Sequence, residues 1–154
     1  MSQDSHSSHI RLGWREWVAL PELGLTHIKA KVDTGARTSA LHAFSHRTFH
    51  ERGVLMVRFR IHPVQRRTDI EQECVAEVID KRTVSDSGGH REKRLVIATP
   101  VELGGRRWEI EMTLTNRDNM QFRMLLGRTA ISGNYVVDPG RSYLVGHKPE
   151  DHDD

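Results

Sequence analysis

Residues 28–36 read Ile28-Lys29-Ala30-Lys31-Val32-Asp33-Thr34-Gly35-Ala36, so an alternating segment runs directly into an acidic turn. The alternation predicts a β-strand over 26–32. The strand end would fix the Asp33 carboxylate, the Thr34 hydroxyl can lock the turn, and Gly35 allows close approach of the backbone. Asp-Thr-Gly is nevertheless a short string, and on its own an ordinary Asx-type turn explains it.

A second element far downstream reads Met124-Leu125-Leu126-Gly127-Arg128. An early Asp-Thr-Gly-Ala turn and a late apolar-apolar-Gly-Arg element are the two-part signature of retropepsins, so the chain resembles that fold group. Between them, the polar, glycine-containing segment 80–92 suits the tip of a mobile flap hairpin. Residues 94–115 predict a second hairpin, because Gly104-Gly105 joins residues 94–103 to the run 108–114, which alternates apolar and polar residues.

Other stretches also favour strands over helices. Period-2 patterns predict further strands at 14–20, 55–61, 73–79 and 134–138. Helical periodicity is scarce and is limited to a turn or two near 38–43 and a short helix at 128–132. The sequence therefore predicts an all-β, retropepsin-like closed barrel with a flap hairpin and one short C-terminal helix.

The 154 residues suffice for one domain, which we place at 12–146, between a disordered N-terminal tail (1–11) and an acidic C-terminal tail (147–154). With four acids in the last five residues, the body of the chain is basic. A basic body attracts nucleic acid, anionic membrane or acidic polypeptide. We find no nucleic-acid reader motif, secretory signal or membrane span, and expect a cytoplasmic protein that binds neither nucleic acid nor membrane.

Three blocks narrow the resemblance: Gly13-Trp14-Arg15-Glu16-Trp17, the run from Lys29 to Ala43, and Met124 to Arg128 with Val137-Asp138-Pro139. They are similar to a bacterial family catalogued as ATP-dependent zinc proteases with a retropepsin-like fold. Some members lie beside RimK, the ligase that adds glutamates to a ribosomal protein, and one member, RimB, is described as a protease of those tails. The resemblance implies a peptidase, a glutamate-rich partner and a functional link to RimK and that ribosomal protein.

An aspartic peptidase needs two carboxylates that share a proton across one water molecule. This chain has one such turn, so Asp33, Thr34 and Gly35 predict half of a catalytic site. The second carboxylate would come from another copy, which predicts a homodimer. Asp138 is an alternative within the chain, but residues 136–140 read as a strand that enters a turn.

Beside the turn, Arg37 takes the position where viral retropepsins commonly carry an aspartate that pairs with the arginine of the Gly-Arg element. Arg128 is retained, so two guanidinium groups need carboxylates. Either each pairs with a residue such as Glu16 or Asp118, or they bind an anionic ligand. Because guanidinium suits carboxylates, we favour an acidic peptide as the ligand.

Other residues near the cleft are candidates for substrate binding. For the arginines in and after the flap segment, Arg82 and Arg94, an ordinary solvated basic face is an equally good interpretation. The candidates, apart from the two arginines above, are Ala36, Arg82, Ser87, Gly88 and Arg94.

Metal and nucleotide sites find little support in the sequence. There is no His-Glu-x-x-His motif, Cys74 is the single cysteine, and His42, His46 and His50 recur every four residues in a poor helix. No glycine loop suits a phosphate, so we expect no cofactor. Two alternatives stay open: a non-catalytic binding module for acidic peptides, and a zinc-dependent peptidase.

Overall fold

The computed structural model describes residues 9–64, 67–85, 88–116 and 122–146. Strands dominate these residues, and one short α-helix follows the tenth strand. This confirms the predicted all-β class. The elements are β1 (Ile10–Gly13), β2 (Arg15–Leu20), the 3-10 turn η1 (Pro21–Leu23), β3 (Leu25–Asp33), β4 (Ser39–His42), β5 (Ser45–Glu51), β6 (Val54–Ile61), β7 (Gln72–Ser85), β8 (Arg91–Leu103), β9 (Arg106–Thr115), β10 (Met124–Gly127), α2 (Arg128–Ile131) and β11 (Tyr135–Asp138).

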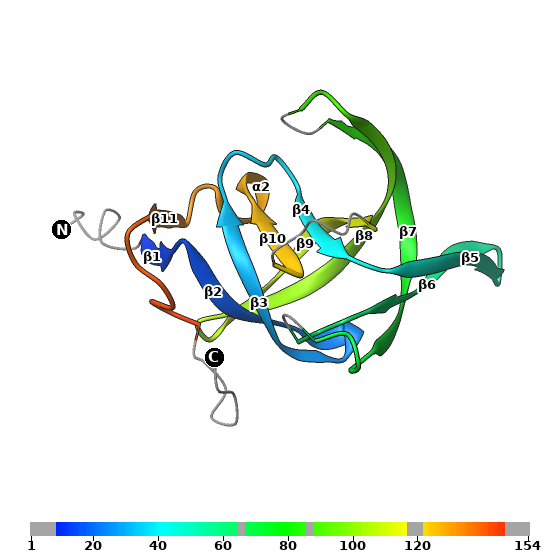
Figure 1. The fold of residues 1–154 in the computed structure, drawn as a ribbon, viewed down its shortest axis with the longest axis horizontal. Helices are drawn as coiled ribbons and strands as arrows, with labels where there is room; N and C mark the ends of the chain where they lie inside the picture. The colour runs from blue at the N-terminus through cyan, green and yellow to red at the C-terminus, as the bar shows by residue number, and fades with distance from the viewer. Residues whose placement is uncertain (1–8, 65–66, 86–87, 117–121, 147–154) are drawn as a thin grey trace.

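Nine strands form one sheet in the order β2-β3-β10-β4-β9-β8-β7-β6-β5, and β1 and β11 form a separate parallel pair. An extra pairing between Ala19 and Glu102 joins β2 to β8, so six strands are paired in a ring. Figure 1 shows β5 and β6 extending from this ring beyond β7. The pairings thus close a ring of six strands, and the closed barrel itself stays a prediction.

The two predicted hairpins are confirmed. β8 and β9 pair from Val96 opposite Thr113 to Leu103 opposite Arg106, and the turn residues Gly104 and Gly105 have φ of 61° and 81°. The segment predicted as a flap lies at the tip of β7 and β8, where Ser85 pairs with Arg91. In Figure 1 this tip lies toward the same end of the view as the turn after β3. The short helix predicted at 128–132 is α2.

The predicted helical turn near 38–43 is wrong, because residues 39–42 form strand β4. All four residues of β4 are buried, and the strand pairs with β10 on one side and β9 on the other. Pairing on both sides therefore outweighs the weak local preference of this segment. Strand β5 was not predicted at all. β1 begins at Ile10, which lies inside the predicted N-terminal tail; residues 1–8 and 147–154 lie outside the described part of the chain.

The core consists of apolar side chains that are fully buried. Such a side chain stabilises the fold by about 1.5–3 kcal/mol relative to exposure. They include Ile28, Leu41, Phe59, Ile97, Met112, Met124 and Leu126. Two tryptophans also belong to the core region: Trp17 is 6% exposed, and Trp108 packs against the core while its Nε1 donates to the Ala130 carbonyl at 3.0 Å.

Glu16 is a carboxylate with no exposed surface, and it ties the end of the described chain to β2. Its Oε2 accepts the backbone N–H groups of Gly13 (2.7 Å) and Leu144 (2.8 Å). Its Oε1 accepts those of Val145 (3.2 Å) and Gly146 (2.7 Å). Four donors thus satisfy one buried charge, as burial of a carboxylate requires. No helix in the described ranges has the length and apolarity needed to cross a bilayer.

Cys74 is buried on β7, and its Sγ lies 3.5 Å from the Leu23 carbonyl oxygen. Burial, with a smaller contribution from the charge of Glu73, raises the pKa of this thiol from 9.0 to about 12. We expect the native thiol to resist iodoacetamide at pH 8 and to react fully once the chain is unfolded in urea. Rapid labelling of the native protein would contradict this placement.

The same raised pKa makes stability depend on alkaline pH. The stabilisation is complete below pH 9, where the unfolded thiol is also protonated, and is lost as the pH rises from 9 to about 12. The loss is about 1.4 kcal/mol per pH unit within that window. Urea unfolding of Cys74→Ala should lack this contribution.

Candidate active site

The two signature elements lie side by side in the nine-stranded sheet. β10 runs parallel to β3, with Leu126 opposite Val32 and Gly127 opposite Asp33. On its other side, β10 is antiparallel to β4, so Met124 lies opposite Leu41. The Gly-Arg element is therefore adjacent to the Asp-Thr-Gly turn, although 94 residues separate Arg128 from Thr34.

The Asp33 turn is closed by the aspartate itself. The Gly35 N–H donates to Asp33 Oδ1 at 3.0 Å, and the Ala36 N–H donates to the Asp33 carbonyl at 3.2 Å. A side chain at Gly35 would place its Cβ 3.3 Å from Oδ1. Asp33 is half-buried and Thr34 and Gly35 are exposed, so the carboxylate is oriented by its own turn and remains accessible.

Gly127 is required where the chain crosses behind this turn. A Cβ at Gly127 would lie 2.6 Å from the carbonyl carbon of Thr38 and 2.8 Å from the Ser39 nitrogen. The Gly127 N–H donates to the buried Ser39 Oγ at 2.9 Å. No other residue fits this contact without moving the backbone, so glycine fixes the distance between the two signature elements.

The start of α2 is bonded to the turn. The Arg128 N–H donates to the Ala36 carbonyl at 2.8 Å, and the Thr129 N–H donates to the Arg37 carbonyl at 3.0 Å. The Arg128 side chain adds a bond from Nη1 to the Thr34 carbonyl at 3.1 Å. Arg128 therefore supports the turn, which leaves part of its exposed guanidinium for a ligand.

Arg37 lies beside the turn and is exposed. Its guanidinium makes no hydrogen bond or ion pair with any residue in the described part of the chain. The suggested pairing of an arginine with Glu16 is wrong, because both oxygens of Glu16 accept hydrogen bonds from backbone N–H groups. The other expected partner, Asp118, lies outside the described residues.

The flap arginines are held by carboxylates of the same chain. Arg82 lies 2.8 Å from both Asp80 and Glu111, and its hydrogen bond with Glu111 raises the pKa of the guanidinium. Arg94 is 12% exposed and pairs with Glu92 at 2.8 Å. Gly88 is exposed in the turn between β7 and β8, and Ser87 lies outside the described residues. Substrate binding by these residues stays a prediction.

Asp138 belongs to a different sheet from Asp33. It ends β11, opposite Gly13 of β1. Its Oδ1 accepts the Gly140 N–H at 3.0 Å, and its Oδ2 lies 3.8 Å from Arg141 Nε. This confirms the prediction that residues 136–140 form a strand that enters a turn.

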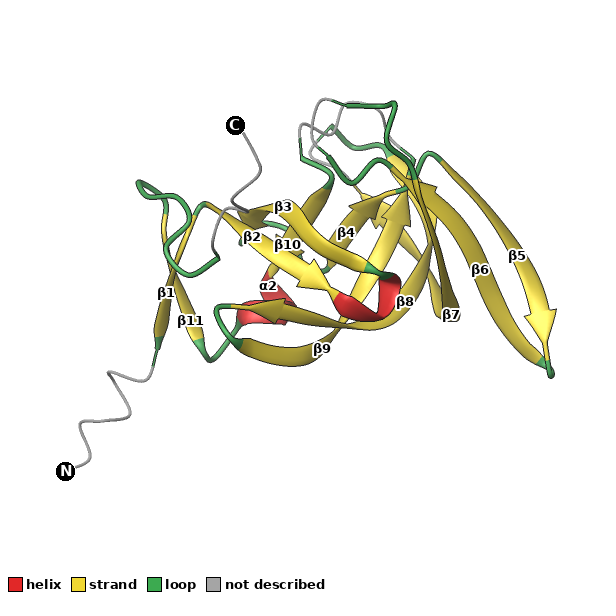
Figure 2. Cartoon of the chain, turned by 90° about the horizontal axis from the view of Figure 1, so that it is seen from below, coloured by secondary structure: helices red, strands yellow, loops and turns green. Residues whose placement is uncertain are grey.

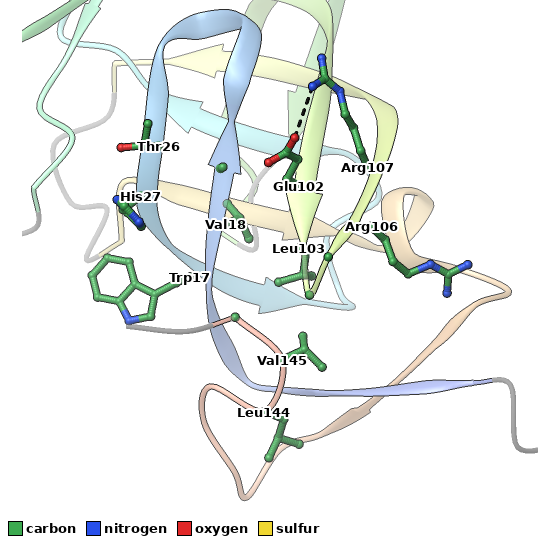
Figure 3. Close-up of a pocket in the computed structure, with 14 residues that line it drawn as sticks. Trp17, Val18, Thr26, His27, Glu102, Leu103, Arg106, Arg107, Leu144 and Val145 are labelled. Atoms are coloured by element: carbon green, nitrogen blue, oxygen red, sulfur yellow. Dashed lines mark hydrogen bonds and ion pairs between the residues drawn. The ribbon is translucent and has the colours of Figure 1, made fainter. Parts of the chain in front are cut away.

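A cleft of about 710 Å³ opens at the other end of β3, and no sequence pattern predicted it. Figure 3 shows its lining, with Trp17, His27 and Val145 around it and an ion pair between Arg107 and Glu102 at 3.3 Å. His27 precedes Asp33 by six residues on the same strand, which corresponds to about 20 Å. This cleft is therefore separate from the aspartate turn.

Comparison with known proteins agrees with this geometry. A family model described as "RimB-like: Retropepsin-like aspartic endopeptidase RimB" matches residues 11–148. The chain belongs to the RimB-like family. The family description names an aspartic endopeptidase and carries no reference to zinc or ATP.

Curated relatives carry RimB-like sequence inside longer chains. A protein of Shewanella pealeana named "Probable alpha-L-glutamate ligase" is 49% identical over 89% of this chain and 30% of its own length. A protein of the same name from Desulfotalea psychrophila is 46% identical over 95% of this chain and 31% of its own. The chain thus spans about 30% of the length of the curated relatives it matches.

A solved structure supports the fold of the RimB-like family independently. The crystal structure of a Legionella pneumophila protein of unknown function superposes with a TM-score of 0.74 at 28% identity. The match covers 90% of this chain and 99% of that one.

The histidines considered as zinc ligands do not converge in this RimB-like chain. His42 is buried on β4, whereas His46 and His50 are exposed on β5, so the three do not share a helix. His46 and His50 thus lie on an exposed strand rather than in a helix. Within ranges 9–64, 67–85, 88–116 and 122–146, no three His, Cys, Asp or Glu side chains cluster as metal ligands would.

Proposed function

We propose that the chain is an aspartic-type endopeptidase in which Asp33 residues of two subunits activate one water molecule. The observation that carries this proposal is the pairing of Asp33 with Gly127 across β3 and β10, which reproduces the two-part retropepsin turn. Family membership supports the reaction class. The exposed Thr34 and Gly35 leave room for a second copy of the turn to approach.

The proposed reaction follows from two carboxyl groups that share one proton. The ionised Asp33 takes a proton from water, and the water oxygen forms a bond to the carbonyl carbon of the substrate. The protonated Asp33 of the other subunit gives its proton to the leaving nitrogen as the C–N bond breaks. The Gly35 N–H bond to Oδ1 holds the carboxylate in the orientation that this transfer needs.

We propose glutamate-rich tails, such as those that RimK adds to a ribosomal protein, as substrates. Arg37 supports this choice, because its guanidinium lies beside the turn without a carboxylate partner among the described residues. Arg128 adds a second cation at the same turn. The relatives named glutamate ligases, which contain a segment similar to this chain, point to the same chemical class.

Replacing Arg37 with alanine should lower kcat/KM for a glutamate-rich peptide about tenfold or more, since a charge-assisted pair with substrate is lost. Cleavage of a neutral peptide of equal length should change less than twofold. Steady-state kinetics on both peptides provide the measurement. Equal losses on both would contradict a role in selecting acidic substrates.

The direct test uses a synthetic peptide that carries a C-terminal run of glutamates. The protein is incubated with this peptide, and fragments are identified by mass spectrometry at protein concentrations below and above the dimerisation midpoint found by sedimentation. New fragments whose rate per subunit rises with the dimer fraction would support the proposal. Full activity of the monomer would contradict it, and loss of activity with a chelator would favour a zinc peptidase.

A binding module for acidic peptides is the second candidate. The observation in its favour is that similar segments form about 30% of chains named as ligases, where holding a glutamate tail would serve the ligase without cleavage. Tight binding of the glutamate peptide without fragments, under all conditions above, would support this candidate.

A further inference from the structure

Strand β5 is the last strand of the nine-stranded sheet and pairs only with β6 among the described residues. Figure 2 shows it as the outermost strand of the hairpin that leaves the ring. Six of its seven residues are exposed, and only Phe49 is half-buried. A strand edge of this length, exposed and unpaired, is a template for pairing with another extended chain.

The hairpin register shows which backbone groups face this edge. Glu51 pairs with Val54 across a two-residue loop, in which Arg52 and Gly53 both have positive φ (55° and 80°). In such a hairpin the closing pair exchanges hydrogen bonds, and alternate residues do the same along the ladder. The N–H and C=O groups of His46, Thr48 and His50 therefore point outward.

A recess of about 340 Å³ lies at the start of the same strand. Its apolar lining comes from Ala43, Leu95 and Leu114, and His46 of β5 forms part of its wall. Lys81 and Lys93 also line it. Lys81 pairs with Leu95 and Lys93 with Thr83, so the two lysines lie on the same face of the β7–β8 hairpin.

The charge of this region is unbalanced. Within the described chain, the ammonium groups of Lys81 and Lys93 and the guanidinium of Arg47 on β5 form no ion pair. Glu92, the acid in the recess lining, is already engaged by Arg94 and by the Thr115 hydroxyl. Cations without carboxylates around a free strand edge suit an extended chain of acidic residues.

We propose that the β5 edge and the recess beside it form an exosite for an extended acidic peptide. The peptide adds as a strand to His46, Thr48 and His50, and its carboxylates meet Lys81 and Lys93. The claim that the exosite holds the distal part of a substrate tail rests on the proposed peptidase function. The claim that it binds an acidic peptide is independent of that function.

The exosite lies within reach of the aspartate turn. Strand β4 leads from the turn to the recess, and seven residues separate Ala36 from Ala43, which spans at most about 25 Å. A tail of about ten extended residues covers this distance, whereas two residues cover about 7 Å. Only long acidic tails would occupy both sites.

Binding is tested with a fluorescein-labelled peptide of ten glutamates, followed by anisotropy on the Asp33→Asn protein so that cleavage cannot interfere. Lys81→Glu with Lys93→Glu should weaken binding about tenfold or more. The matched control, Arg11→Glu with Arg106→Glu, reverses the charge of two exposed residues elsewhere and should change binding less than threefold. Equal losses in both pairs would overturn the exosite.

Strand addition has its own test at Thr48. Thr48→Pro removes an outward N–H, and an edge strand tolerates proline where that group faces solvent. Binding should weaken about fivefold or more with an unchanged circular dichroism spectrum, while Thr48→Val should bind as before. Unchanged binding of a folded Thr48→Pro protein would overturn strand addition. A ten-nucleotide RNA bound more tightly than the peptide through the same lysines would overturn the acidic-peptide assignment.

Kinetics separate this inference from the proposed function. Two substrates share one cleavage region and carry either two or ten further glutamates. The lysine pair should lower kcat/KM about fivefold or more for the long substrate alone. Equal kinetics on both substrates would overturn the exosite and keep the peptidase, whereas binding without any cleavage would keep the exosite and overturn the peptidase.

Discussion

Replacing Asp33 with asparagine is expected to lower kcat for peptide cleavage about 1000-fold or more. Asparagine cannot take up or release the proton that the reaction needs, and general acid–base catalysis contributes about 10² to 10⁴. The amide oxygen can still accept the Gly35 N–H, so the turn and the fold should persist. The rate is measured from fragments quantified by mass spectrometry, and folding from the thermal unfolding midpoint.

Asp138→Asn is the matched control, and it also tests the alternative within the chain. Asp138 lies on the β1–β11 sheet and is bonded to Gly140 and close to Arg141. Its replacement should change kcat less than twofold. A folded Asp33→Asn protein that keeps wild-type activity, or a large loss in Asp138→Asn, would move the catalytic group away from position 33.

Glu16→Ala should lower the free energy of unfolding by about 3 kcal/mol or more. It leaves the N–H groups of Gly13, Leu144, Val145 and Gly146 without their acceptor, and an unsatisfied buried donor costs about 1–3 kcal/mol. The loss stays below the sum of the four separate costs, because some of the freed N–H groups can relax and bind water. For a domain of this size, the unfolding midpoint should fall by about 10 °C.

Urea unfolding measures this loss, with Glu109→Ala as a control. Glu109 is exposed on β9, and its replacement should stay within about 0.5 kcal/mol. Glu16→Gln should also destabilise, because its NH2 group faces backbone donors. A Glu16→Ala protein as stable as the Glu109→Ala protein would show that the C-terminal segment is not held by this carboxylate.

Much of the fold could be predicted because its strands alternate. β6 alternates between buried and exposed residues over its second half, β3 and β9 do so over part of their length, and each shows a period-2 pattern in the sequence. β4 and β5 left none, for opposite reasons. β4 is buried at every position, whereas β5 is exposed almost throughout, so neither has a face that alternates.

The part of the candidate site that consists of sequence motifs could be predicted. Asp33 and Gly127 could be recognised in the sequence, and the register adds that they are neighbours. The partners of charged residues could not be found, because they depend on pairing across strands. Glu16 accepts bonds from residues 128 to 130 positions away, and Arg82 meets Glu111 only through the arrangement of β7, β8 and β9.

Mixing subunits tests most directly whether two Asp33 residues build one site. A fixed amount of wild-type protein is equilibrated with increasing Asp33→Asn protein, at concentrations where sedimentation shows dimers, and peptide cleavage is measured. If the site is shared, mixed dimers are inactive, and activity should fall to about one half at an equal amount and about one quarter at a threefold excess. Activity that stays constant at every ratio would contradict a shared site.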